Sequence, residues 1–379
     1  MNNMVKSTVA HVFWDTAPYL AVNLVKNLKY PEDVVYAREM FEMTSNASGR
    51  SRNIDWTKDI AKGMYVGYLK QPSVLRRRAF SVHLSILLRL LFTDFNLRSW
   101  IMIIKGPRNW VLHGAICSFT TMLLLRIIGK RIVLLHWGGM PSVGKYKGAL
   151  DRGAYRLCNH LFVLISPELR YFSGFVGQSK LSVLPYPLVV GGLARRRTWA
   201  IENPRRWLLI GNNGLVMNSY SLVLDRIPAG SWEKIICMLN YGQSEDSPHM
   251  RNFIEKYKKK FGEAFVPWIK TIPIDEYLRY MENCCAYICP WEWQSGIGAA
   301  YVSIVQGKAV FLAGDNYEWM KSNGIYVSEL GRLEDFSFTE ISHHIPTEDM
   351  YENILEAVRK LSEQNTPQYW HKRLKEDFL

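Results

Sequence analysis

The sequence lacks the signals that mark several classes of protein. It has no internal repeat, no low-complexity stretch and no C-x-x-C pair among its six cysteines. No uninterrupted run reaches the about 20 apolar residues that span a bilayer, because Arg89 and Arg126 interrupt the best candidates, 79–92 and 115–128. No secretory signal precedes the strand-like residues 9–13. We therefore expect a cytoplasmic protein that is soluble or peripherally bound to a membrane.

The cysteines also lack the surroundings of a metal site. Cys284, Cys285 and Cys289 form the closest group, and they lie in or beside the strand-like segment 286–289. No nearby histidine completes a zinc-like pattern, so we predict inert core thiols and no bound metal.

The chain does have a globular composition and an uneven charge. Its 379 residues are 48% hydrophobic and 21% charged, which excludes a disordered or fibrous protein and suits about two domains. Residues 1–200 carry 28 Lys and Arg against 10 Asp and Glu, a net +18, whereas residues 201–379 carry 19 against 24, a net −5. The overall +13 indicates an anionic partner: nucleic acid, a phosphorylated substrate or an acidic lipid surface.

Strand-like and helix-like segments alternate in both halves. In the second half we predict strands at 207–210, 234–239, 265–270, 286–289, 308–312 and 325–327, and helices at 218–226, 248–261, 274–283, 296–305, 347–362 and 367–377. In the first half we predict strands at 9–13, 109–112, 132–135, 161–165 and 181–184, and helices at 21–28 and 115–128. The Pro-, Gly- and Arg-rich stretch 185–205 is typical of a linker. Alternation of this kind predicts doubly wound parallel sheets with Rossmann-like topology.

Two loops of the second half are candidate ligand sites, because ligands bind beyond the carboxyl ends of parallel strands. The first, Gly211-Asn212-Asn213-Gly214, follows a strand directly; its alternative interpretation is an ordinary turn. The second, 290–298, ends in Ser295-Gly296-Ile297-Gly298 and opens a helix, whose free N–H groups suit a diphosphate. Trp291 and Trp293 offer a flat face to a base or sugar, or close the edge of the domain.

The first half carries polar or small residues at three strand ends. They are Asp15, His113-Gly114 and His136-Trp137-Gly138-Gly139. A His or Asp at such a position can act as a general base toward an acceptor hydroxyl, although structural histidines are also common there.

The segment from Arg76-Arg77-Arg78 to Phe92 has a narrow polar stripe and a broad apolar face. We expect either an amphipathic helix at an anionic bilayer surface, with Arg76, Arg77 and Arg78 as membrane contacts, or a core helix of the first domain.

The second half resembles the bacterial 4-acetamido-4,6-dideoxygalactose (Fuc4NAc) transferases, glycosyltransferase family 56. The resemblance begins at Gly211-Asn212-Asn213-Gly214-x-x-x-Asn218 and covers most of the chain after about residue 108. Further matching segments are Met238–Gly242, Asp275-x-Tyr277-Leu278, 294–298, Gln306-Gly307, His113-Gly114 and Trp137-Gly138.

The resemblance implies a GT-B fold, with two Rossmann-like α/β domains facing a central cleft. Residues 1–190 would bind the acceptor and residues 191–363 the nucleotide sugar, while the helix 364–379 would pack back on the first domain. The donor, dTDP- or UDP-linked, would contact Gly211, Asn212, Asn213, Asn218, Tyr241, Gln294, Ser295, Gly296, Ile297 and Gly298.

The same resemblance implies an undecaprenyl-diphosphate-linked acceptor at the inner face of the cytoplasmic membrane, in surface-polysaccharide synthesis. His113, Gly114, Trp137, Gly138 and Gly139 would line the acceptor side, with Asp15 and His136 as candidate catalytic groups. No cofactor and no nucleic-acid partner are expected. The alternatives are a non-catalytic basic protein that binds membrane or nucleic acid through a Rossmann-like fold, and another nucleotide-dependent enzyme such as an epimerase.

Overall fold

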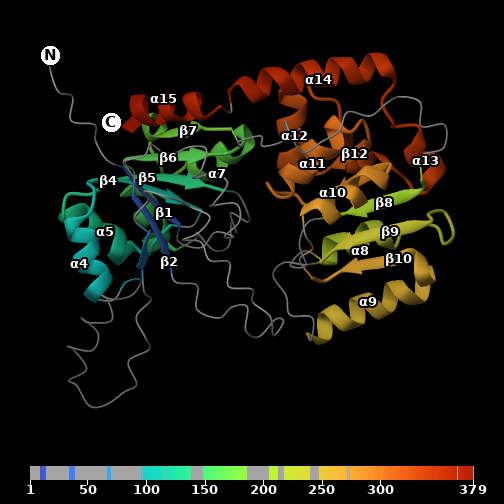
Figure 1. Ribbon diagram of the computed structural model, residues 1–379, viewed down its shortest axis with the longest axis horizontal. Coiled ribbons are helices and arrows are strands. Elements are labelled where there is room, and N and C mark those ends of the chain that lie inside the picture. Colours follow the sequence, from blue (N-terminus) through green and yellow to red (C-terminus); the bar gives the residue numbers. More distant parts are fainter. Residues whose placement is uncertain are drawn as a thin grey trace. The chain divides into compact units, whose positions relative to one another are not determined.

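Two compact units make up the described part of the computed structural model (Figure 1). It describes residues 9–13, 34–38, 66–69, 95, 97–114, 116–137, 148–185, 205–211, 217–239, 247–270, 272, 274–364 and 366–378. The first unit contains the described residues up to Pro185 together with those from Thr366 onward, and the second contains the described residues between 205 and 364.

The first unit is built on a seven-stranded sheet in which each neighbouring pair is parallel. The spatial order is β3 (Val66–Leu69), β2 (Val34–Arg38), β1 (Val9–Phe13), β4 (Asn109–His113), β5 (Arg131–His136), β6 (His160–Val163) and β7 (Leu181–Val183). The winding direction reverses between β1 and β4, so the carboxyl ends of these two strands flank the switch point.

Alternate residues of β4 supply two separate cores, one on each face of this sheet. Trp110 and Leu112 pack in the core beneath α4 (Leu97–Lys105), α5 (Phe119–Ile127), α6 (Ala149–Arg156) and α7 (Leu169–Phe172). Val111, between them, lies in the core of the other face. This alternation follows from the two-residue period of a strand and explains why β4 is buried at all five positions.

The C-terminal helix α15 (Pro367–Phe378) covers that other face. Trp370 and Leu374 pack against Val111, Val133 and neighbouring strand residues. The indole Nε1 of Trp370 donates a hydrogen bond to the Pro185 carbonyl over 3.2 Å, so its polar edge is satisfied inside the core. The last helix of the chain therefore completes the first unit.

Truncation of Trp370 should destabilise the first unit selectively. Trp370 is 1% exposed, so Trp370→Ala leaves a cavity and an unpaired Pro185 carbonyl, and we expect a loss of about 3–5 kcal/mol in the free energy of unfolding. Urea unfolding would show this as an earlier transition of the first unit. Lys372→Ala, at an exposed position of the same helix, should change stability by about 0.5 kcal/mol or less; equal effects of the two variants would contradict the packing.

The second unit repeats this plan with six strands. The order is β10 (Phe265–Trp268), β9 (Lys234–Met238), β8 (Trp207–Ile210), β11 (Ala286–Cys289), β12 (Ala309–Leu312) and β13 (Ser328–Glu329), again parallel throughout. Its helices are α8 (Met217–Leu224), α9 (Pro248–Phe261), α10 (Ile274–Asn283), α11 (Ile297–Val305), α12 (Gly314–Ser322), α13 (Phe338–Ser342) and α14 (Glu348–Glu363). The predicted α/β class with two doubly wound sheets is confirmed.

Side chains cap several helix ends of the second unit. The hydroxyl of Ser247 accepts from the Met250 amide at the start of α9, and that of Thr347 does so for Met350 in α14. At the carboxyl end of α10, the buried ammonium of Lys308 donates to the Met281 and Cys284 carbonyls. These bonds explain where the helices begin and end.

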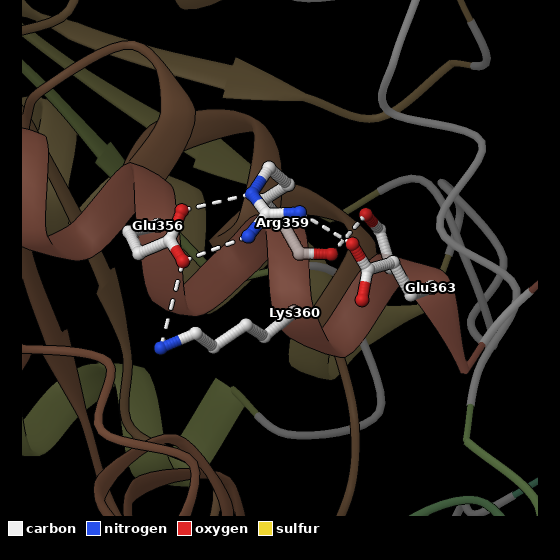
Figure 2. Close-up of polar contacts among 5 residues, drawn as sticks. Glu356, Arg359, Lys360 and Glu363 are labelled. Atoms are coloured by element: carbon white, nitrogen blue, oxygen red, sulfur yellow. Dashed lines mark hydrogen bonds and ion pairs between the residues drawn. The ribbon is translucent and has the colours of Figure 1, made fainter.

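An exposed ion network lines the outer side of α14 (Figure 2). Arg359 Nη2 lies 2.8 Å from Glu356 Oε1, Lys360 Nζ lies 3.5 Å from the same oxygen, and Arg359 also pairs with Glu363. The hydrogen bond from Arg359 lowers the pKa of Glu356 to about 2. Because all these groups face water, the network contributes little to stability.

The structure departs from the predicted elements at several positions. Strands β2 and β3 and helices α4, α6, α7, α12 and α13 were not predicted, and the strand expected at 325–327 is the two-residue β13 at Ser328–Glu329. The helices predicted at 21–28 and around Arg76–Arg78 lie outside the described residues. Within the described residues, no helix is both long and apolar enough to span a bilayer.

Candidate functional site

The two predicted ligand loops start from adjacent strands. Strands β8 and β11 are neighbours at the switch point of the second sheet, although about 75 residues separate them in sequence. The amide of Gly211, directly after β8, donates to the Ile288 carbonyl of β11 over 2.8 Å. Both loops therefore leave the sheet at one place, which is where open α/β sheets bind ligands.

Gly211 makes the tight exit from β8 possible. Its φ is +76°, in the left-handed region, and the ring of the buried Tyr220 from α8 lies against it. A Cβ at this position would stand 2.1–2.4 Å from three atoms of Tyr220, so only glycine fits. Asn218, predicted to contact the donor, is exposed on the first turn of the same helix.

Hydrogen bonds from three residues to its backbone carbonyl groups hold the loop between β11 and α11 in place. The buried Asn316 donates through Nδ2 to the Ser295 carbonyl over 2.6 Å, and Tyr287 Oη donates to the Gly296 carbonyl over 3.3 Å. The amide of Asp315 donates to the Glu292 carbonyl over 2.9 Å. Burial raises the pKa of Tyr287 well above its usual value, so this phenol stays a neutral donor. With three carbonyls engaged, the loop has a defined conformation before any ligand binds.

The start of α11 presents open backbone N–H groups. Gly296 caps the helix in a left-handed conformation and has no side chain that could bond the amides of the first turn. Gly298 follows at the second helical position, is exposed, and has nothing within 4 Å of where a Cβ would stand. Partial positive charge at a helix N-terminus favours a bound anion. Ile297 and Gln294 are buried, whereas Gly298 is exposed. The predicted motif 294–298 therefore has buried side chains that fix it in the unit and an exposed backbone that a ligand could reach.

The two tryptophans of the loop pack edge-to-face. Their ring centroids are 5.0 Å apart at 71°. Trp291 also packs on the core of the second unit. Trp291 therefore covers the edge of the core at this loop, and Trp293 packs on Trp291.

Gly314 holds this loop against α12. Its φ is +47°, and a Cβ would lie 2.0 Å from the Glu292 carbonyl oxygen. Gly314→Ala should therefore displace the loop and lower the free energy of unfolding by at least about 2 kcal/mol. Gly331→Ala, where nothing lies within 4 Å, is the matched control and should be neutral. Chemical denaturation measures both; a neutral Gly314→Ala would contradict the close contact.

Two predicted residues of the first unit meet at the ends of β4 and β5. His113 is buried and its ring meets Trp137 edge-to-face, with centroids 5.8 Å apart at 87°. The amide of Gly114, at φ +92°, donates to the Leu135 carbonyl over 2.9 Å. The structure thus brings His113, Gly114 and Trp137 together at the carboxyl edge of this sheet.

His136 belongs to the interior of the first unit. It is 3% exposed, its ring packs on Phe172 at 5.0 Å, and Nε2 lies 3.9 Å from the buried Glu168. Burial lowers the pKa of His136 to about 4, so at neutral pH the imidazole is uncharged and the contact with Glu168 is not an ion pair. An enclosed imidazole of such low basicity is poorly suited to accept a proton from a substrate.

The depressed pKa of His136 predicts acid sensitivity. In the unfolded chain the imidazole has its ordinary pKa of about 6.5. Below that pH the unfolded state therefore binds a proton that the folded state does not bind, which favours unfolding. The stability that depends on the neutral ring is complete above about 6.5 and is lost as the pH falls toward about 4, up to roughly 3 kcal/mol. The free energy of unfolding, measured by denaturant titration across this pH range, should depend less steeply on pH in His136→Asn than in the parent. An unchanged slope in His136→Asn would refute the assignment.

Several predicted site residues lie outside the described residues. They are Asp15, Arg76, Arg77, Arg78, Gly138, Gly139, Asn212, Asn213 and Tyr241. Their proposed roles stay predictions.

The structure adds residues that the sequence analysis did not single out. Asn316 and Tyr287 hold the β11–α11 loop, Tyr220 packs on Gly211, and Glu168 lies beside His136. The sequence could have indicated Gly314-Asp315-Asn316 as a further candidate, because small and polar residues follow a buried strand there as they do in the other candidate loops. No local signal distinguishes Tyr220, Tyr287 or Glu168, because their partners are distant in sequence.

All six cysteines are buried. Burial raises the pKa of the Cys158 and Cys284 thiols to about 12 and that of Cys289 to about 11, which keeps them protonated. Across the described ranges, no three His, Cys, Asp or Glu side chains are placed to hold a metal ion.

Comparison with known proteins places the fold. No protein-family model matches the sequence, and no curated protein matches it. Among solved structures, it is similar to a UDP-forming α,α-trehalose-phosphate synthase from Burkholderia vietnamiensis, with a TM-score of 0.61 and 12% identity over 98% of this chain and 99% of that one. A glycosyltransferase from Rickettsia africae gives 0.58 and 11% over 98% of both chains. A putative UDP-N-acetylglucosamine 2-epimerase from Listeria monocytogenes gives 0.51 and 11% over 93% and 91%. At this identity the likeness concerns architecture, and the chain has the GT-B fold of two Rossmann-like units.

Proposed function

We propose that the protein is a glycosyltransferase that takes its sugar from a nucleotide-sugar donor. The observation that carries the proposal is the position of the two loops, Gly211 onward and 290–298, at one switch point of the second sheet. The GT-B fold, shared with solved glycosyltransferases, supports the same reaction class.

In this proposal the diphosphate of the donor binds the N-terminus of α11. The amides around Gly296, Ile297 and Gly298 would hold its oxygens, and the helix dipole would offset the charge of the departing nucleotide. Gln294 and Ser295 belong to the same loop, while Gly211, Asn212, Asn213, Asn218 and Tyr241 would contact the remainder of the donor.

The acceptor would bind the first unit, at His113, Gly114, Trp137, Gly138 and Gly139. In transfer, the bond from the anomeric carbon to the diphosphate breaks, and a bond to the acceptor oxygen forms as the hydroxyl loses its proton. Of the two candidate bases, the interior position of His136 favours a positioning role, which leaves Asp15 as the stronger candidate.

For the acceptor we propose a saccharide on undecaprenyl diphosphate, as in bacterial surface-polysaccharide synthesis at the inner face of the cytoplasmic membrane. The resemblance to glycosyltransferase family 56 and the net +18 of residues 1–200 support this assignment. A dTDP- or UDP-linked deoxyamino sugar is the corresponding donor.

A second candidate is epimerisation of a nucleotide sugar, because the Listeria structure described as an epimerase shares the fold. Mass spectrometry separates the two: an epimerase returns a nucleotide sugar of unchanged mass, whereas a transferase releases nucleoside diphosphate only when an acceptor is present.

The donor site is tested by a charge at Gly298. Gly298→Asp places a carboxylate beside the proposed diphosphate, and we expect nucleotide-sugar affinity to fall at least about tenfold. An acidic residue in the first turn stabilises a helix, so the unfolding temperature should not fall. Gly298→Ala adds a methyl group in open space and should bind as the parent does.

The measurement begins with a thermal-shift screen of dTDP-, UDP- and GDP-sugars, followed by calorimetry on the best ligand. Unchanged nucleotide-sugar affinity in Gly298→Asp would contradict the proposal that the diphosphate binds at the N-terminus of α11. A parent protein that binds none of these donors would refute the proposed function.

A further inference from the structure

Exposed apolar side chains gather on one part of the first unit. Seven of the nine large apolar side chains that are exposed in the described ranges lie on or next to α4, α5 and α6. They are Leu97, Ile101, Ile104, Leu123, Ile127, Ile128 and Leu150. Exposed apolar side chains gathered on one part of a folded unit mark an interaction site.

On α4 the apolar residues form a stripe that the core does not use. Leu97, Ile101 and Ile104 follow the i, i+4, i+7 spacing of one helix face and are 64%, 48% and 59% exposed. Trp100 and Ile103 face the sheet instead. The helix is therefore apolar on two sides, and only one of them has a partner in the described fold.

Helix α5 continues this surface. Leu123 and Ile127 are exposed at i and i+4, while Met122 and Leu125 face the sheet. Hydrogen bonds join the carboxyl ends of α4 and α5: Arg108 Nε donates to the Gly129 carbonyl over 3.2 Å, and Lys130 Nζ to the Gly106 carbonyl over 2.8 Å. These bonds hold together the segments that follow the two helices, and Figure 1 shows α4 and α5 on the same side of the first unit.

The charge of this region has a single sign. Between Asp94 and Asp151 the chain has eight Lys and Arg and no Asp or Glu. Lys105, Arg108 and Arg126 are exposed at the carboxyl ends of α4 and α5, where Ile104 and Ile127 also lie. Apolar side chains bordered by Lys105, Arg108 and Arg126 complement an anionic bilayer: the apolar groups enter the interface and the cations meet the headgroups.

We propose that the α4–α5 surface, defined by Leu97, Ile101, Ile104, Lys105, Leu123, Ile127 and Ile128, docks the protein on an anionic lipid bilayer. The inference deepens the proposed function, on which it rests for the biological reason: a lipid-linked acceptor must be met at a membrane. The docking itself is a physical property of this surface and can be measured without donor or acceptor.

The test is sedimentation of the full chain with vesicles of phosphatidylglycerol and phosphatidylcholine, against vesicles of phosphatidylcholine alone. We expect binding to the anionic vesicles that weakens as salt is raised. The double variant Ile104→Glu with Ile127→Glu should lower the partition coefficient by roughly tenfold or more. The matched control, Leu222→Glu with Tyr326→Glu, makes the same change at two exposed apolar positions of the second unit and should stay within about twofold of the parent.

Two further measurements separate the possible failures. Circular dichroism and calorimetry with a nucleotide sugar should show that the Ile104/Ile127 variant is folded and binds donor like the parent; Ile104→Ser with Ile127→Ser is the milder substitute. Absence of vesicle binding by the parent, or equal binding by parent and variant, overturns the inference. A parent dimer in light scattering that Ile104→Glu with Ile127→Glu dissociates would assign the surface to a second copy and also overturn it. If the vesicle results hold but no nucleotide sugar binds, the proposed function fails alone.

Discussion

The pairing of β8 with β11 is the constraint on which the candidate site depends. These strands lie far apart in sequence, yet their register places Ile210 opposite Ile288, and the Gly211 amide extends the ladder by one more bond. If this pairing shifted, the loop after β8 and the start of α11 would leave the sheet at different heights. The exit at Gly211 and the start of α11 lie at one place because these two strands end side by side.

Polar side chains lie in the enclosed interior beside this pairing. Asp315 and Asn316 are fully buried behind the β11–α11 loop, and the phenol of Tyr287 reaches the same loop. Buried polar groups must be satisfied, and here the loop carbonyls satisfy several of them. These buried polar groups therefore keep the loop ordered without ligand. A disordered loop would lose conformational entropy on binding, which would weaken affinity.

The first unit distributes its chemistry differently. Its strand ends direct His113 and His136 into packed aromatic surroundings, whereas its outer helices display apolar and cationic side chains. The C-terminal helix α15 closes the opposite face of the sheet through Trp370 and Leu374. The unit is therefore covered on one face by a distant part of the chain, and on the other by helices whose outer sides are apolar.

The sequence by itself determined the α/β class, most strands of both sheets, and the two loops of the second unit, because strand burial and small residues at strand ends are local properties. It did not reveal β2 and β3, and it predicted the edge strand at 325–327 where the structure has β13, because a two-residue strand carries too little pattern to be located. The sequence also did not determine whether a polar residue faces solvent or the core. His136 lies at the end of a strand in the way an exposed general base would, yet it is only 3% exposed. Only the tertiary structure decided that β8 adjoins β11, that Asn316 and Tyr287 support the loop, and that the stripe on α4 faces outward. Each of these depends on contacts between residues far apart in the chain, which no local pattern records.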